Sequence, residues 1–154
     1  MMKKSYSTWG PSYKVSFSII IKELPTKRWT SIIHVTKGKN DSNIGDRIPA
    51  VFLHFDKWFK TVRIVVCSAI NWKRNFCRGF NAKMNKEYDI TIQQSKKGGE
   101  YWYQLIVPGV TSRPFRNGMP RKFNNVKLFT SDPWYAAFTS DIGTISNLKI
   151  ENHE

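Results

Sequence analysis

Two acidic side chains, Glu87 and Asp89, stand two residues apart in the segment KEYDITI. Alternate residues of a β-strand point to the same face of a sheet, so both carboxylates would share one face. Retaining hydrolysis of a glycosidic bond uses two carboxylates about 5 Å apart that flank the bond. The neighbouring residues are basic, however, and two exposed acids on a strand explain the pair more simply. We therefore expect no catalytic role for it.

The three histidines do not form a catalytic or metal site that can be recognised from their spacing. His34 and His54 fall in runs of strand-like residues, and His153 lies near the end of the chain. A single histidine in a strand is more often packed or solvated than catalytic. No Ser–His–Asp arrangement and no zinc pattern of clustered cysteines and histidines is present. The sequence indicates a protein that is not an enzyme.

Basic residues interleaved with aromatic residues give the strongest functional signal. Arginine forks match the oxygens of sulfate and phosphate groups, and adjacent aromatic rings can stack on sugars or bases. The alternative is a solvated basic rim, with Trp134 packed beneath its loop. The candidate ligand-binding residues lie in three segments: Trp72, Lys73, Arg74 and Arg78; Arg113, Arg116, Arg121 and Lys122; and Trp134 with Tyr135.

The segment NIGDRIPAVFLHF joins an acid–base pair to an apolar run. Either Asp46 and Arg47 form a ligand or metal site on a loop, or they hold the start of a buried strand in place. Gly45 would permit the turn, Asp46 would accept backbone hydrogen bonds, and Arg47 would pair with a carboxylate. We favour the structural role.

The segment CSAINWKRNFC reads as a hairpin that turns near Trp72. This turn places Cys67 directly opposite Cys77, which is close enough for a disulfide across the hairpin. In an oxidising compartment we expect this bond to form. In a reducing compartment the two cysteines would be small apolar fillers.

The chain has 154 residues, with 25 Lys and Arg against 11 Asp and Glu, for a net charge of +14. A field of this size favours an acidic partner: nucleic acid, sulfated glycan, anionic lipid or an acidic protein. No apolar run approaches the roughly 20 residues of a membrane span. The start MMKK lacks the apolar segment of a signal peptide, so we expect no export signal in the chain as written.

Alternation of apolar and polar residues dominates the chain, as in SYKVSFSIIIKEL. About nine such runs are separated by turn segments, and no segment shows a helical period. Pro49 should lie at the start of a strand, at an edge or at a bulge, because it cannot donate to the ladder. We expect one all-β domain over residues 1–154, with its core at about 9–151, built as an antiparallel sandwich or barrel.

Several segments together resemble a known layout: WTSIIHVT, GDRIPAVFL, ITIQQ with YWYQLIV, FNNVKLFTSDPWY and GTISNLKI. The chain resembles concanavalin A-like (laminin-G-like) jelly-roll domains of extracellular animal proteins, and the related farnesoic acid O-methyltransferase-type domain. GDRIPA and SDPWY are the most specific pieces, and the resemblance covers roughly residues 9–151. It implies a two-sheet jelly-roll sandwich that binds glycans or proteins.

The resemblance also suggests two further features. Laminin-G-like domains can hold calcium at the rim, for which Asp41, Asp46 and Asp141 are the loop candidates, although the positive charge argues against a strong site. Some sandwich glucanases carry acid–x–acid–x–x–acid on one strand; Glu87 and Asp89 match its first two positions, but Ile92 occupies the third.

We therefore expect a non-catalytic, lectin-like extracellular module whose rim loops recognise carbohydrate, including sulfated or acidic glycans, or a matrix protein. It would require no cofactor. One alternative is a sandwich glycoside hydrolase that acts on polysaccharide. Another is nucleic-acid binding driven by charge, which no nucleic-acid motif supports.

Overall fold

The computed structural model describes residues 1–41 and 43–153, and within these residues it contains strands and turns but no helix. The larger sheet runs in the order β1-β10-β3-β4-β5-β6, with β11 added in parallel beside β3. Its strands are β1 (Met2–Trp9), β3 (Trp29–Thr36), β4 (Ala50–Asp56), β5 (Thr61–Ile70), β6 (Lys73–Ala82), β10 (Phe123–Thr130) and β11 (Ala136–Ala137).

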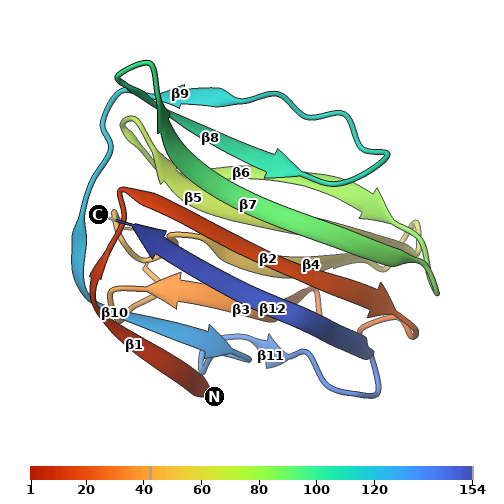
Figure 1. The fold of residues 1–154 in the computed structure, drawn as a ribbon. Coiled ribbons are helices and arrows are strands. Elements are labelled where there is room, and N and C mark those ends of the chain that lie inside the picture. The colour runs from red at the N-terminus through yellow and green to blue at the C-terminus, as the bar shows by residue number, and fades with distance from the viewer. Residues whose placement is uncertain (42, 154) are drawn as a thin grey trace.

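The smaller sheet runs in the order β12-β2-β7-β8-β9 and lies in front of the larger one in Figure 1. Its strands are β2 (Ser12–Ile21), β7 (Glu87–Lys97), β8 (Glu100–Ile106), β9 (Phe115–Asn117) and β12 (Gly143–His153). All of its pairings are antiparallel. The molecule is thus the antiparallel two-sheet sandwich that the alternating pattern predicts.

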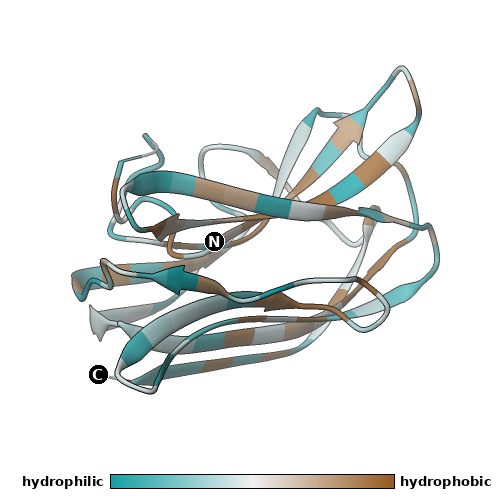
Figure 2. Ribbon diagram, turned by 90° about the horizontal axis from the view of Figure 1, so that it is seen from above, coloured by the Kyte–Doolittle hydropathy of each residue, from teal (hydrophilic) through white to brown (hydrophobic). Residues whose placement is uncertain are grey.

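The core lies between the two sheets because one face of each strand is apolar. Tyr13, Val15 and Phe17 of β2 are buried, while Lys14, between the first two, is exposed. Figure 2 shows the same alternation of hydrophilic and hydrophobic residues along the strands. Burying one such Val or Phe side chain contributes about 1.5–3 kcal/mol.

The nine predicted strands are all present, and Pro49 directly precedes β4, as expected. Three strands were not predicted. β1 is mostly polar and exposed, and it forms an edge of the larger sheet. β9 and β11 have only three and two residues, too few to show a period.

The β5–β6 hairpin turns at Asn71 and Trp72, as predicted, and places Cys67 opposite Cys77. The two cysteines form a disulfide, which confirms the expected pairing. Both pack on the outer face of the larger sheet, in a cluster with Ala50 and Phe52 that is separate from the main core.

At one flank of the sandwich, the last strand of each sheet pairs on one side only within the described residues. These strands are β6, at the end of the larger sheet, and β9, at the end of the smaller one. Phe76 of β6 and Phe115 of β9 meet edge to face, with their ring centroids 4.9 Å apart. We call this flank the β6–β9 edge.

Candidate functional site

The tip of the β5–β6 hairpin is tied to the segment that follows β9. The backbone amide of Asn71 donates to Asn117 Oδ1 at 2.9 Å, and its side-chain amide donates to the Arg116 carbonyl at 3.1 Å. The Gly118 amide donates in turn to Asn71 Oδ1 at 2.6 Å. Asn71 has a φ of 55°, which asparagine tolerates better than most residues. These bonds bring two of the predicted basic segments together.

Two arginines, one on β6 and one in the segment that precedes β9, converge on one aromatic ring at the β6–β9 edge. The guanidinium carbon of Arg78 lies 5.0 Å from the ring centroid of Phe115, and that of Arg113 lies 5.2 Å from it. Arg78 is also 4.2 Å from the ring of Phe76, and Lys73 Nζ is 5.6 Å from that ring. Cations within about 6 Å of an aromatic ring are attracted to its face.

The charges of Arg78 and Arg113 are not neutralised within the described residues, where neither forms an ion pair. Because both lie beside the Phe115 ring, they are at most about 10 Å apart. This is close to the screening length of about 10 Å at 0.1 M salt, so they repel each other. An anion bound between them would relieve this repulsion.

A groove of about 180 Å³ opens beside the two arginines. Its polar lining residues are Arg78, Tyr103, Thr111, Ser112 and Arg113, and Phe115 forms an apolar wall. Tyr103 is buried, and its hydroxyl has no hydrogen-bond partner among the described residues. Burial and the neighbouring Tyr13 hold the pKa of Tyr103 well above its usual range, although Arg78 acts in the opposite direction. The groove therefore offers donors for an anionic ligand.

The remaining basic candidates are placed differently. Arg116 forms an ion pair with Glu100, with Nε 3.1 Å from Oε1, and both side chains are exposed. Lys122 is exposed in the segment before β10, and Trp72 is exposed at the hairpin tip. Arg74 donates to Asn43 Oδ1 at 3.4 Å and so leans away from the groove toward the 43–47 loop.

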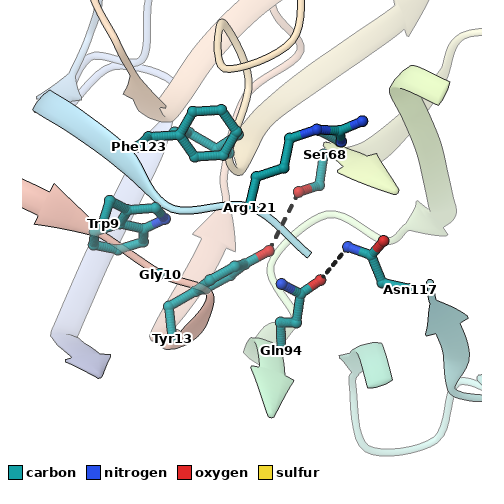
Figure 3. A pocket seen from close by; sticks show the side chains of 10 residues that line it. Trp9, Gly10, Tyr13, Ser68, Gln94, Asn117, Arg121 and Phe123 are labelled. Atoms are coloured by element: carbon teal, nitrogen blue, oxygen red, sulfur yellow. Dashed lines mark hydrogen bonds between the residues drawn. The ribbon is translucent and has the colours of Figure 1, made fainter. Parts of the chain in front are cut away.

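Arg121 lines a separate, small cavity of about 10 Å³, which Figure 3 shows. Buried amides organise this cavity: Asn117 Nδ2 donates to Gln94 Oε1 at 2.8 Å, and Gln94 Nε2 donates to the Pro11 carbonyl at 2.7 Å. The hydroxyls of Tyr13 and Ser68 lie 3.2 Å apart. A cavity of this size holds about one water molecule, which indicates a structural network around Arg121.

The Asp46–Arg47 pair forms a structural clasp, but its partners differ from those expected. Gly45 has a φ of 96°, and Asp46 Oδ2 accepts from the amides of Asp41 and Asn43 at 3.0 and 3.1 Å, as predicted. The prediction of a carboxylate partner for Arg47 is wrong. Arg47 donates to three neutral oxygens instead: Asn40 Oδ1, Asn75 Oδ1 and the Tyr135 hydroxyl.

A buried histidine connects this clasp to the SDPWY segment. His34 Nε2 donates to the Asp46 carbonyl at 2.6 Å, and Nδ1 lies 2.7 Å from Asp132 Oδ2. Asp132 Oδ1 accepts from the amides of Trp134 and Tyr135 at 2.9 and 3.0 Å. Burial alone would raise the pKa of Asp132, but the hydrogen bonds with His34 and with the Trp134 amide outweigh it and lower the pKa.

Trp134 and Tyr135 therefore serve largely to cover the outer face of the larger sheet. Trp134 packs edge to face on His34 and Phe129 and keeps 39% of its surface exposed. Tyr135 packs on Phe52 in the same way. Tyr135 also lines a depression of about 390 Å³ with Trp29, Arg47, Phe52, Asn75 and the disulfide. The side chains of the SDPWY segment are not part of the groove at the β6–β9 edge.

The acidic candidates lie elsewhere. Glu87 and Asp89 are exposed on β7, and the Ser18 hydroxyl donates to Asp89 Oδ1 at 2.6 Å. Ile92 is fully buried in the core, so the third position of the glucanase pattern faces away from the first two.

Within residues 1–41 and 43–153, no three Asp, Glu, His or Cys side chains are grouped so that they could hold a metal ion. None of the described residues forms a helix able to cross a bilayer.

Sequence reasoning missed the apolar part of the groove and its buried hydroxyl. Phe115 lies in a segment that also contains Pro114 and Pro120. Its position beside the groove follows only from the pairing of β9 with β8. Tyr103 was assigned to a strand, but the unpaired state of its hydroxyl depends on the neighbours from both sheets. The exposed pair Trp58 and Phe59 was also missed, although its position in the turn segment DKWFKT was a usable signal.

The comparisons with known proteins define the fold class. Neither a known family profile nor a curated protein matches the sequence. A heptameric SAP-like pentraxin from Limulus polyphemus superposes with a TM-score of 0.59 at 12% identity, covering 97% of this chain and 67% of that one. An alginate lyase from Pseudomonas aeruginosa superposes with a TM-score of 0.60 at 10% identity, covering 92% and 65%.

A family 7 alginate lyase, solved with a substrate bound, gives a TM-score of 0.54 at 13% identity. The chain spans about two thirds of the length of each of these structures. Identities this low establish a shared fold and nothing about activity. The fold is an all-β, concanavalin A-like jelly-roll sandwich.

Proposed function

We propose that this protein is a non-catalytic, extracellular binding module that recognises acidic glycans through the groove at the β6–β9 edge. The observation that carries the proposal is the convergence of Arg78 and Arg113 on Phe115, without a carboxylate partner in the described residues. Guanidinium groups bind sulfate and carboxylate oxygens in a bidentate geometry, and an adjacent ring can contact the face of a sugar.

The chemistry of the groove supports binding more than catalysis. Among the described residues, its lining includes arginine, serine, threonine and tyrosine, but no Asp, Glu or His. Besides the arginines, the titratable group of this described lining is the Tyr103 hydroxyl, whose raised pKa makes it a poor base near neutrality. The groove thus holds groups that can retain an anionic sugar, without an evident group that abstracts a proton.

An extracellular setting agrees with the disulfide between Cys67 and Cys77, since such bonds persist in oxidising compartments. The resemblance of the sequence to laminin-G-like domains of extracellular animal proteins points the same way. A matrix protein that carries acidic groups would pair with the same arginines, and we regard it as the second candidate partner of the groove.

The test compares two variants that each remove two positive charges. In the first, Arg78→Gln and Arg113→Gln are combined; in the control, Lys3→Ala and Lys4→Ala change exposed residues of β1, at the opposite edge of the larger sheet. Binding to heparin and to alginate is measured by calorimetry at low and physiological salt, with and without calcium. We expect the arginine variant to lose about tenfold or more in affinity at physiological salt, and the control less than about threefold.

Equal losses in both variants would show that only the total charge matters and would contradict a specific groove. Stronger binding to single-stranded nucleic acid than to heparin in competition would favour nucleic-acid binding instead. Shortening of alginate chains during long incubation would contradict the non-catalytic part of the proposal and favour a polysaccharide-degrading enzyme.

A further inference from the structure

Two adjacent aromatic side chains project into solvent at the β4–β5 hairpin. Trp58 is 85% exposed, the highest value among the described large hydrophobic residues, and Phe59 is 79% exposed. Such residues are normally buried, and two of them side by side form an apolar patch that soluble surfaces avoid unless it is used. The patch has no part in the groove described above, which lies on another flank.

The turn itself holds these rings outward. Asp56 Oδ1 accepts from the backbone amides of Trp58 and Phe59 at 2.9 and 3.2 Å, and Lys60 follows with a φ of 55°. These contacts give the hairpin tip a defined conformation in which neither ring folds back on the sheet. The exposure of the two rings is therefore a property of the turn.

Basic residues are concentrated in the hairpin tip and in the adjacent 22–28 loop. The tip and the adjacent 22–28 loop are joined where the Phe55 amide donates to the Arg28 carbonyl at 2.9 Å. These two segments, residues 22–28 and 56–60, together contain two acids, Glu23 and Asp56, and five basic residues: Lys22, Lys27, Arg28, Lys57 and Lys60. Asp56 is already engaged by the backbone.

A groove of about 540 Å³ separates the hairpin tip from this loop, with Arg28 and Lys57 among its lining residues. His54, also in its lining, has its pKa lowered by burial and by the Arg28 charge, which agrees with a cationic environment. Leu24 of the same loop is 41% exposed and adds to the apolar surface.

We propose that this end of the sandwich docks on an anionic phospholipid bilayer, with Trp58 and Phe59 inserted at the headgroup level. Aromatic rings favour the membrane interface, and lysine or arginine side chains beside them bind lipid phosphates while their stems stay apolar. Each such cation adds attraction to an anionic leaflet. A protruding tip suits a fluid surface that deforms around it, whereas a sugar or a folded protein would offer a fixed shape.

The first experiment is co-sedimentation with vesicles that contain about 30% phosphatidylserine in phosphatidylcholine, at physiological ionic strength. We expect wild-type protein to bind these vesicles and to bind pure phosphatidylcholine at least tenfold more weakly. Combining Trp58→Ser with Phe59→Ser should lower binding by about tenfold or more, and Lys57→Glu with Lys60→Glu should lower it similarly.

Trp72 provides a matched control, because it is also 79% exposed at a hairpin tip and has basic neighbours. It lies at the other end of β5, about 30 Å from Trp58 for a ten-residue strand. The variant Trp72→Ser should bind vesicles within about twofold of wild type. The Trp58/Phe59 variant should in turn keep its affinity for heparin, so this inference and the proposed glycan site can fail separately.

A second measurement reports insertion itself. Lipids brominated in the acyl chain quench tryptophan fluorescence on contact, so wild-type protein should be quenched, and Trp58→Phe should bind but lose most of the quenching. Vesicle binding by the Trp58/Phe59 variant within twofold of wild type would overturn the proposal. An equal loss in Trp72→Ser, or equal binding to neutral vesicles, would overturn it as well.

Discussion

At the scale of single residues, the carboxylate of Asp132 links two parts of the fold. Its carboxylate contacts His34 and caps the SDPWY turn, and these bonds lower its pKa despite burial. The contribution of Asp132 to stability is therefore complete above its unfolded pKa of about 3.9 and is lost as the pH falls through the lower folded pKa.

We predict that Asp132→Asn destabilises the protein by about 1–3 kcal/mol at neutral pH, because it weakens hydrogen bonds made by a buried charge. Its free energy of unfolding should also depend less on pH than that of wild type between about pH 5 and 2. Urea unfolding across this range checks both points. Asp141→Asn, at an exposed loop position, is the control and should follow wild type.

At the scale of elements, the β5–β6 hairpin combines the disulfide with the basic tip. The bond joins residues ten apart, and closing a loop of this length in the unfolded chain corresponds to about 2–3 kcal/mol of stabilisation. We predict that Cys67→Ala with Cys77→Ala lowers the free energy of unfolding by about this amount in urea. Two free thiols in denatured, unreduced protein would contradict the pairing.

The same hairpin shows what can be predicted from a sequence. Its turn, its register and the opposed cysteines follow from local spacing, because each residue of an antiparallel pair is fixed by the turn that joins the strands. The contact of Asn71 with Asn117 joins segments 46 residues apart, and no local pattern encodes it. The groove likewise joins residues of β6, β8 and the 110–115 segment, so it could not be predicted locally; the role of its arginines in binding stays a prediction.

The Asp46–Arg47 pair illustrates a partial success. The structural role of the pair was predicted because Gly45 and Asp46 precede an apolar run. The partners of Arg47 were not, since two neutral side chains, Asn75 and Tyr135, come from distant strands and loops and replace the expected carboxylate. The charge of Arg47 alone predicts an acidic partner. In the folded chain its guanidinium group donates instead to the neutral oxygens that lie nearby.

At the scale of the whole molecule, the net charge of +14 attracts any polyanion and must be separated from specific recognition. We predict that the logarithm of the heparin association constant falls linearly with the logarithm of salt concentration. Replacing Arg78 and Arg113 with glutamine should make this slope shallower by about one to two. An unchanged slope would mean that these arginines do not contact the glycan.

Arg78 also affects how copies of the protein behave toward one another. It lies on β6, a strand with an unpaired edge, in line with the buried Phe76 and Phe80 rather than with outward-facing residues. An inward charge on an edge strand discourages sheet extension from one molecule to the next. Replacing this arginine with a hydrophobic residue would therefore remove part of the proposed ligand site and would also favour edge-to-edge association of copies, so one residue would serve both the proposed recognition and colloidal stability.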